Sequence, residues 1–393
     1  MGPAVTYAYL DYAASAPLRP EALEAERSYD ASPVAGANPN SLHSMGRAAA
    51  RELDRARREL AACLGGAFRP SDVTFTSGGT ESNNLAVIGL AEGARARDAR
   101  RRRVVLSAIE HDSVLDLVGP LRDRGFEVEL ARPDRSGVVG PRALEGLVDA
   151  SCALVSVMAA NNETGVLQPT GELARAAHAA GALFHTDAVQ ALGHVPLDVA
   201  DADAVSVAAH KLGGPVGVGA LAVRGRAPLR PISFGGGQEQ GRRAGTQDVR
   251  GALAFAAAAR ACAATLDRTA AEVAGRARRL AGALCAPGTG IVATTDAERR
   301  LPGIVNVMAP GLDSETMILA LDQEGFEVSA GSACSSGSLD ASHVLLAMGI
   351  PREEALGSLR ISFDERVGDD VLARLAQALV RIVAERGRSR ARR

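Results

Sequence analysis

The chain has 393 residues, a formal net charge of −2 and an apolar content of 47%. This length and composition describe a globular protein with room for two or three domains, and the near-neutral charge argues against nucleic acid as a main partner. Because no leader-like segment and no run of about 18 apolar residues is evident, we expect a cytoplasmic protein without a membrane span.

Short apolar strands alternate with amphipathic helices through the first 260 residues. Strands are expected at 73–76, 104–107, 153–158, 182–186, 204–207 and 218–223. Helices are expected from about residue 81 and after residue 112. Runs such as ALVSV and VGALAV are apolar on both faces, which is typical of a mainly parallel sheet covered by helices. The pattern therefore predicts an α/β layer architecture.

A long alanine-rich helix is expected next, over about 248–285, and a second αβ unit follows it. In that unit we expect strands at 304–307, 327–329 and 358–362, and helices at 314–324 and from about 369. We place a large domain at 16–260. A smaller C-terminal domain would comprise 261–393, with residues 1–15 packed against it.

The cysteines lie at positions 63, 152, 262, 285 and 334, an odd number without a CxxC pair. This arrangement indicates reduced thiols rather than a disulfide framework or a zinc site, so no metal is expected. Four of them lie in Ala- and Leu-rich stretches, where a small buried apolar side chain is the ordinary role. Cys334 is different, because GSACSSGS (331–338) has the composition of a loop on which a thiol is available as a nucleophile.

The segment FTSGGTESNN (75–84) runs from a predicted strand through Gly79 and Thr80 into a helix. Backbone N–H groups and a hydroxyl at a helix N-terminus form a ready site for an anion such as phosphate. A tight turn with Thr80 as helix cap would explain the segment equally well on its own. The segment is neither a Walker A sequence nor GxGxxG, so a nucleoside triphosphate or NAD has little support.

Lys211 is the sole lysine among 44 Lys and Arg residues. An amine can lose its proton and attack a carbonyl, whereas guanidinium stays charged, so Lys211 is a candidate Schiff-base lysine. Chance survival of one surface lysine is the alternative on composition alone. Asp187 lies just past a predicted strand end, where open α/β sheets place ligands; it could hold a protonated pyridine nitrogen or simply cap a helix. Phosphate anchor, carboxylate and lone amine together describe a pyridoxal phosphate (PLP) site.

At this point the chain resembles the cysteine desulfurases of the NifS/IscS type, in the class V aminotransferase group of fold-type I PLP enzymes. The matching motifs run in family order nearly from end to end. They are YLDYAASAP (9–17), NPNSLH (38–43), FTSGGTESNN (75–84), EHDSV (110–114), NNETG (161–165), HTDAVQ (185–190), HK (210–211), GGGQEQGRRAGT (235–246), SAGSACSSGS (329–338) and LRISF (359–363). The resemblance implies a large domain with a mainly parallel seven-stranded sheet and a smaller α+β domain that carries Cys334.

The resemblance also implies roles for the residues around the PLP ring. Lys211 would form the Schiff base and later move the substrate's Cα proton. Asp187 would keep the pyridine nitrogen protonated, and Gln190 would bond the phenolic oxygen. His111 would stack on the ring face and act as a proton shuttle.

Further residues would hold the phosphate and the substrate. Gly79, Thr80 and His210 would bind the phosphate, with Thr246 reaching across the interface of a homodimer. Asn162 would lie near the cofactor and the substrate carboxylate. Arg360 would clamp that carboxylate through a bidentate pair.

The implied reaction converts L-cysteine to L-alanine, with a persulfide formed on Cys334. The sulfur would pass to a protein acceptor for iron–sulfur clusters, tRNA thiolation or a sulfur-containing metabolite, without direct nucleic acid contact. A selenocysteine lyase or another class V aminotransferase is the first alternative, and Cys334 discriminates because an aminotransferase has no use for a loop thiol. A non-catalytic scaffold is the second, and the joint presence of Lys211, Asp187, His111 and Cys334 argues against it.

Two positions depart from the family pattern. Ala208 stands three residues before the lysine, where a phosphate-binding serine is usual, so weaker phosphate anchoring is expected; Ser206 could substitute only if the backbone shifts. Asp364 replaces the commoner glycine after LRISF, which could alter the substrate entrance.

Overall fold

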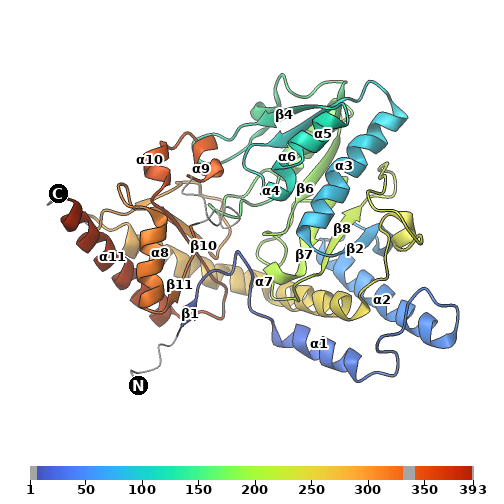
Figure 1. Ribbon diagram of the computed structural model, residues 1–393, viewed down its shortest axis with the longest axis horizontal. Helices are drawn as coiled ribbons and strands as arrows, with labels where there is room; N and C mark the ends of the chain where they lie inside the picture. The colour runs from blue at the N-terminus through green and yellow to red at the C-terminus, as the bar shows by residue number, and fades with distance from the viewer. Residues whose placement is uncertain (1–6, 331–340, 392–393) are drawn as a thin grey trace.

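Seven strands form one central sheet in the computed structural model, which describes residues 7–330 and 341–391 (Figure 1). They are β2 (Val73–Thr76), β3 (Arg103–Ser107), β4 (Glu127–Ala131), β5 (Cys152–Ser156), β6 (Leu183–Asp187), β7 (Ala204–Ala208) and β8 (Gly219–Val223). Their order is β2-β8-β7-β6-β5-β3-β4. Strand β8 runs antiparallel to both neighbours, and the other pairs are parallel. The α/β class and the mainly parallel seven-stranded sheet are confirmed.

Strand β4 is the one member of this sheet that the sequence analysis missed. It lies at the edge of the sheet beside β3, and three of its five residues are exposed. The sequence EVELA therefore lacks the continuous apolar run that identifies the interior strands.

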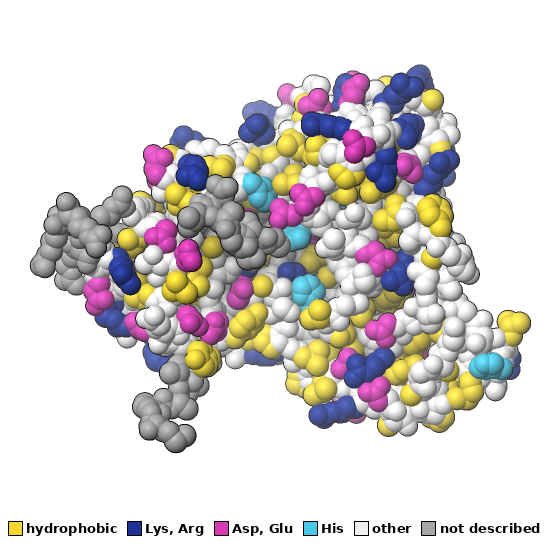
Figure 2. Space-filling view, viewed as in Figure 1, with side chains coloured by type: hydrophobic (Ala, Val, Ile, Leu, Met, Phe, Trp, Pro, Cys, Tyr) yellow, Lys and Arg dark blue, Asp and Glu magenta, His cyan; other side chains and the backbone are white. Residues whose placement is uncertain are grey.

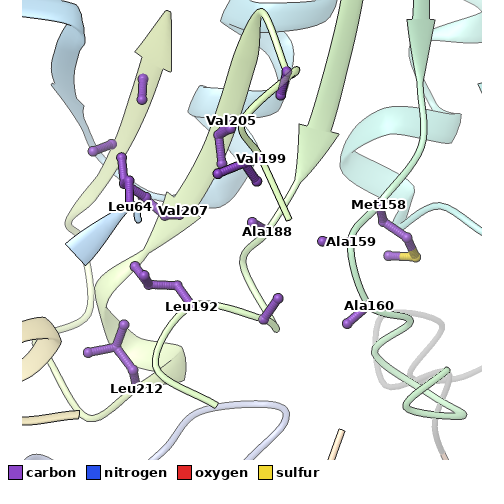
Figure 3. Close-up of a cluster of buried hydrophobic side chains, with 14 of the residues drawn as sticks. Leu64, Met158, Ala159, Ala160, Ala188, Leu192, Val199, Val205, Val207 and Leu212 are labelled. Atoms are coloured by element: carbon purple, nitrogen blue, oxygen red, sulfur yellow. The ribbon is translucent and has the colours of Figure 1, made fainter. Parts of the chain in front are cut away.

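Helices cover both faces of the sheet, as the two-sided apolar runs predicted. On one face lie α3 (Gly79–Arg97) and α5 (Val118–Asp123); α2 (Ser44–Cys63), α6 (Thr170–Ala179) and α7 (Val249–Leu284) cover the other. Strand β3 shows the alternation, because Val104 and Leu106 pack with the α3 layer and Val105 with the opposite layer. Figure 3 shows the second layer, where Val205 and Val207 of β7 lie near Val199 and Leu64.

Helix α7 is 36 residues long and is capped at its N-terminus by Asp248, whose carboxylate accepts a hydrogen bond from the Gly251 N–H at 2.9 Å. By length and composition alone, one 18-residue window of α7 is apolar enough to cross a membrane. However, 61% of that window is buried inside the protein, as in a core helix. Helix α1 (Pro20–Asp30) and α2 both pack along α7.

The C-terminal part holds a three-stranded antiparallel sheet with the order β12-β10-β9. Its strands are β9 (Val292–Ala293), β10 (Ile304–Met308) and β12 (Ser358–Ser362), and its helices are α8 (Ser314–Gln323), α9 (His343–Ala347), α10 (Arg352–Ala355) and α11 (Asp369–Ala391). The N-terminal strand β1 (Ala8–Tyr9) pairs with β11 (Phe326–Glu327), and Leu10 is buried in the same core. Ala8 and Tyr12 also pack against this core, whereas Ala13 packs in the core of the central sheet, and the assignment of residues 1–15 to the smaller domain stays a prediction.

Helix α7 takes part in both hydrophobic cores. Its residues up to Cys262 pack with the sheet, whereas Val273, Leu280 and Leu284 pack with the C-terminal strands and α11. The domain boundary predicted after residue 260 therefore falls inside one continuous helix, and the division into two domains stays a prediction.

Candidate active site

A cavity of about 310 Å³ opens at the carboxyl ends of the parallel strands, on the side that faces the C-terminal part. Nine of the residues singled out from the sequence line it: Gly79, Thr80, His111, Asn162, Asp187, Gln190, His210, Lys211 and Arg360. Histidine side chains gather near the middle of this face, beside a cationic side chain (Figure 2). Eight of them come together because they end or follow strands of the central sheet that finish at the same edge, whereas Arg360, 281 positions after Gly79, reaches the cavity from the C-terminal sheet.

Asp187 is the last residue of β6 and is buried at the cavity wall. Its carboxylate accepts hydrogen bonds from the Val189 N–H at 2.8 Å and from the Asn83 amide at 2.6 Å. Burial raises the pKa of Asp187, and these two hydrogen bonds, with the positive charge of nearby groups, act against that rise. Both donors are neutral, so the carboxylate can take a cationic partner from the cavity.

Lys211 follows β7 in a short helical turn and projects into the same cavity. Its Nζ donates hydrogen bonds to the backbone carbonyls of Ala13 at 2.7 Å and Ala14 at 2.9 Å. The N-terminal segment thus holds the amine at a fixed place beside Asp187.

Helix α3 begins at Gly79, so the N–H groups of its first turn face the cavity as the sequence predicted. A Cβ on Gly79 would lie 2.9 Å from the Val189 side chain, and one on Gly219 would lie 2.6 Å from the backbone of Gly78. Larger residues at these glycines would displace the start of the helix. The 19-residue helix offers an anion the positive end of its dipole and the Thr80 hydroxyl.

His111 caps α4 (Asp112–Leu115), and its Nδ1 accepts a hydrogen bond from the Ser113 N–H at 3.0 Å. An Nδ1 that accepts a backbone N–H carries no proton, so the ring proton of a neutral His111 lies on Nε2. The ring is therefore fixed in orientation at the cavity wall, on the opposite side of β6 from Lys211 in the strand order β3-β5-β6-β7.

Arg360 lies on β12 and reaches the cavity from the C-terminal sheet, with only 2% of the residue exposed. Its guanidinium donates to the Asn162 carbonyl at 2.8 Å and to the Asp11 carboxylate at 2.7 Å. An anionic ligand would therefore meet a cation that Asp11 already orients.

The remaining predicted residues in the cavity are Gln190 and His210. The Gln190 amide donates to the Ala13 carbonyl at 2.8 Å. His210 Nδ1 lies 3.4 Å from the Ser15 hydroxyl, and burial, with a smaller effect of Lys211, lowers the pKa of His210 to about 4. His210 is therefore a neutral donor or acceptor at neutral pH.

Ser206 does not take the place of the serine missing at position 208. It is fully buried, and its hydroxyl lies 2.9 Å from His185 Nε2, while Ser156 lies 2.8 Å from His185 Nδ1. Burial lowers the pKa of His185 to about 3, so this chain of hydrogen bonds across β5, β6 and β7 is neutral. Ala208 lies 3.7 Å from an ideal Cβ on Gly79 and contributes no polar group.

Two other sequence expectations find no place in the cavity of this chain. Thr246 is exposed and does not line it in this chain. The nearby Arg243 nevertheless donates from Nε to the Glu81 carboxylate at 2.9 Å, which holds the segment around Thr246 against the N-terminal end of α3. Asp364 is buried among arginines rather than at the cavity mouth. Cys334 lies outside the described residues.

Sequence reasoning missed the residues that support the ones it selected. Asn83 lies one helical turn after Gly79 on the buried face of α3, so its spacing within FTSGGTESNN could have suggested it. Asp11 gave no local signal, because its partner is 349 residues away. Glu110 is also buried behind the cavity, and its Oε1 accepts from the Ser107 hydroxyl and the Met158 N–H, both at 2.6 Å.

Comparison with known proteins places the chain among enzymes with this architecture. The family described as "Aminotransferase class-V" matches residues 8–368. An "IscS-like cysteine desulfurase" of Mycobacterium tuberculosis is 40% identical over 361 residues, covering 90% of this chain and 91% of that protein. A "Cysteine desulfurase IscS" of Dictyoglomus turgidum is 36% identical over 380 residues, covering 94% of this chain and 95% of that protein.

Solved structures agree with these relatives. One described as "NIFS-LIKE PROTEIN" superposes with a TM-score of 0.88 at 33% identity and covers 96% of this chain and 100% of its own. Another, "SspA in complex with cysteine", has a TM-score of 0.76 at 31% identity, covering 90% of this chain and 98% of its own.

Proposed function

The chain belongs to the class V aminotransferase family, and we propose that it acts there as a PLP-dependent cysteine desulfurase. The observation that carries this proposal is the position of the only lysine. Its amine lies in one cavity with a buried carboxylate at a strand end and with the N-terminus of a 19-residue helix.

The residues of the cavity fit PLP in three respects. The Asp187 carboxylate is buried and, among the described residues, forms no ion pair. A protonated pyridine nitrogen would therefore supply its cationic partner. The N–H groups at the start of α3, with Thr80 and His210, suit a phosphate. The Lys211 amine suits an aldehyde. Gln190 and His111 supply a polar contact and a flat ring surface for the rest of the cofactor.

Bound there, PLP would withdraw electrons from the substrate's Cα and so weaken the bonds around it. Asp187 would keep a proton on the pyridine nitrogen. Lys211, once its amine is free, would carry a proton to or from Cα. His111 is oriented by Ser113 and would exchange a proton through Nε2.

The substrate carboxylate would bind Arg360, which Asp11 and the Asn162 carbonyl hold in place. L-Cysteine is the substrate that the relatives' names suggest, and one structural neighbour is described in complex with cysteine.

Cys334 would accept the sulfur. Its thiolate attacks the substrate sulfur, an S–S bond forms, and the C–S bond of the substrate breaks. The electron pair stays on the carbon skeleton and takes up a proton, which gives L-alanine and a persulfide on Cys334. No external oxidant is needed. The residue lies outside the described segments, so this role rests on its motif.

The experiment uses the full chain loaded with PLP. We expect the wild type to show a visible band at about 400 nm, to take a borohydride label at position 211 and to form alanine from L-cysteine. Lys211→Ala should lose the label. Mass analysis should find an adduct of about 32 Da, one sulfur atom, on the peptide that contains Cys334. Cys334→Ser should keep the band and form no persulfide. Cys285→Ser, a partly exposed thiol in α7's C-cap, is the matched control and should behave as the wild type.

Three results would overturn the proposal. Wild-type protein that takes no borohydride label at Lys211 would exclude the PLP chemistry. A selenocysteine lyase would instead be indicated if Cys334→Ser turned over L-selenocysteine as fast as the wild type and no form of the protein turned over L-cysteine. Transamination without a thiol requirement would indicate an ordinary aminotransferase.

We further propose a cytoplasmic homodimer in which Thr246 completes the partner's phosphate site, and a protein that accepts the sulfur. Iron–sulfur cluster assembly, tRNA thiolation and sulfur metabolite synthesis are the candidate destinations. Size-exclusion chromatography with light scattering tests the dimer, and transfer of ³⁵S from the persulfide to candidate carrier proteins tests the acceptor.

A further inference from the structure

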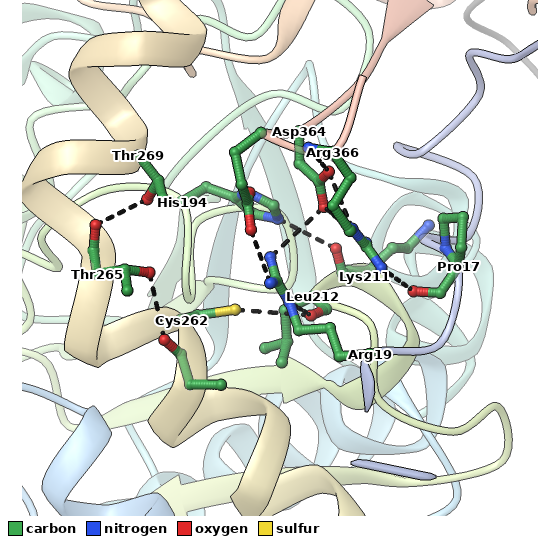
Figure 4. A network of polar contacts seen from close by, with 12 residues as sticks. Pro17, Arg19, His194, Lys211, Leu212, Cys262, Thr265, Thr269, Asp364 and Arg366 are labelled. Atoms are coloured by element: carbon green, nitrogen blue, oxygen red, sulfur yellow. Dashed lines mark hydrogen bonds and ion pairs between the residues drawn. The ribbon is translucent and has the colours of Figure 1, made fainter. Parts of the chain in front are cut away.

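A network of buried charges lies directly behind the turn that carries Lys211 (Figure 4). It joins three segments that are distant in sequence: the N-terminal residues 13–19, the turn 210–214 and the residues 364–366 that follow β12. None of its charged side chains lines the cavity, so the proposed chemistry makes no use of them.

Asp364 is the centre of this network. Its carboxylate lies 2.6 Å from the Arg366 guanidinium and 3.4 Å from that of Arg19, and it also accepts from the Arg366 N–H at 2.9 Å. Only 4% of the Asp364 side chain and 10% of the Arg19 side chain are exposed. Ion pairs this well buried are screened little by solvent, so the carboxylate helps to fix both guanidinium groups. Arg19 has a second anionic partner, since its other terminal nitrogen lies 2.7 Å from the Glu365 carboxylate.

Arg19 connects the network to the lysine turn. Its Nε donates to the carbonyl of Leu212, the residue after Lys211, at 2.9 Å, and its backbone N–H donates to the Gly213 carbonyl at 2.8 Å. Gly213 has a φ of +87°, and a Cβ there would lie 2.6 Å from Arg19 Cγ. The Arg19 side chain therefore packs on the turn and also bonds to it.

Arg366 connects the network to the segment that holds the lysine amine. Its guanidinium donates to the Pro17 carbonyl at 2.9 Å. Four residues earlier in this segment, the carbonyl of Ala13 accepts from Lys211 Nζ, and the Ala13 N–H donates to the Ser362 hydroxyl at 2.9 Å. The position of the amine thus depends on where this segment lies.

His194 completes the support of the turn. Its Nε2 donates to the backbone carbonyl of Lys211 at 3.1 Å, and burial lowers the pKa of His194, so the ring stays neutral and keeps this bond. The carbonyls of Lys211 and Leu212 are therefore both held by side chains from outside the turn.

We propose that Asp364 is a positioning residue for Lys211: through Arg19 and Arg366 it fixes the lysine turn and the Ala13–Ala14 carbonyls, and so places the amine. The inference deepens the proposed function, since a placed amine serves that chemistry. It also gives Asp364, the acidic residue that follows β12, a role in supporting Lys211 rather than a role at the cavity mouth.

The uniqueness of Lys211 makes the inference directly measurable. In the full chain freed of cofactor with hydroxylamine, limiting acetic anhydride at pH 8 acetylates side-chain amines at a single position, and peptide mass analysis gives the rate at Lys211. An ammonium held by two carbonyls reacts slowly, because only the free, deprotonated amine is nucleophilic. A lysine-containing peptide in the same tube calibrates the reagent.

Asp364→Asn keeps the shape of the side chain and removes its charge; we expect Lys211 to react at least threefold faster. Arg19→Met keeps the stem that packs on Gly213 and should have a similar effect. Asp364→Glu should largely restore the slow rate. Asp369→Asn is the matched control, because it breaks the exposed Arg279–Asp369 pair, also in the C-terminal part, at 2.7 Å. It should leave the rate at Lys211 unchanged.

Circular dichroism identifies folded variants, and Arg366→Gln replaces Asp364→Asn if the latter does not fold. Wild-type labelling rates in Asp364→Asn and Arg19→Met would overturn the inference, as would an equal acceleration in Asp369→Asn. In PLP-loaded protein, the pH midpoint of the visible band should also shift in Asp364→Asn but not in Asp369→Asn. Since acetylation needs no cofactor, its failure would leave the proposed function standing, and absence of a PLP band in the wild type would leave the acetylation result standing.

Discussion

Glu110 offers the sharpest test of the electrostatics behind the cavity. Its side chain is fully buried, and burial raises the pKa of Glu110 to about 8, with a smaller contribution from the Asp187 charge. Hydrogen bonds from Ser107 and Met158 oppose the rise. Both bonds reach Oε1, so a proton on Oε2 leaves them intact. Glu110→Gln replaces this neutral acid with a neutral amide of the same shape.

The sign and size of the effect follow from linkage. The folded-state pKa, about 8, lies above the ordinary value of 4.5, so the stability that Glu110 contributes is complete below pH 4.5. It is lost as the pH rises through about 8, because only the unfolded chain ionises readily. Glutamine carries no such dependence. At about 1.4 kcal/mol per pH unit, Glu110→Gln should gain roughly 4 kcal/mol relative to the wild type between pH 5 and pH 9.

Urea unfolding of both proteins at pH 5, 7 and 9 measures this gain as the difference between their unfolding free energies. Glu145→Gln, the same change at an exposed site, is the control and should give a difference that changes by less than about 0.5 kcal/mol. If the Glu110→Gln difference is equally flat with pH, Glu110 ionises normally in the folded protein and the reasoning fails.

Other predictions concern the proposed ligand contacts. Arg360→Lys keeps the charge but loses the planar fork, so KM for L-cysteine should rise about 10-fold in alanine-release assays; an unchanged KM would remove Arg360 from carboxylate binding. Thr246→Ala should speed PLP loss during dialysis several-fold, and an unaltered rate would contradict its contact with the partner's phosphate site. Ala208→Ser adds a hydroxyl near Gly79 and should slow PLP loss; faster loss would indicate that the added hydroxyl disturbs the start of α3 instead of binding the phosphate.

Sequence reasoning succeeded where the signal was local. The strands β2, β3, β6, β7 and β8 were predicted within a residue or two because their apolar runs are short and bounded by turn residues. The helix expected at 248–285 is α7 itself, marked by Asp248 at its start. The clustering of Asp187 and Lys211 also followed from local sequence, since each comes just after a parallel strand.

The missed features depend on contacts between distant residues. The hydrogen bond between Ser206 and His185 follows from the register of β6 with β7, which no local sequence pattern reveals. The same holds for Asp364, whose partner Arg19 is 345 residues away. A buried side chain's role depends on what surrounds it, and that information enters only with the fold.

Helix α7 has a mechanical consequence for the whole molecule. At about 1.5 Å per residue its 36 residues span roughly 54 Å, as one rod anchored in both hydrophobic cores. Between Cys262 and Val273 the rod is mostly exposed, so its stiffness there comes from backbone hydrogen bonds and from the helical preference of alanine. Any swing of one half of the protein against the other must bend this stretch, so its bending stiffness limits how far the Arg360 side of the cavity can travel from the Lys211 side.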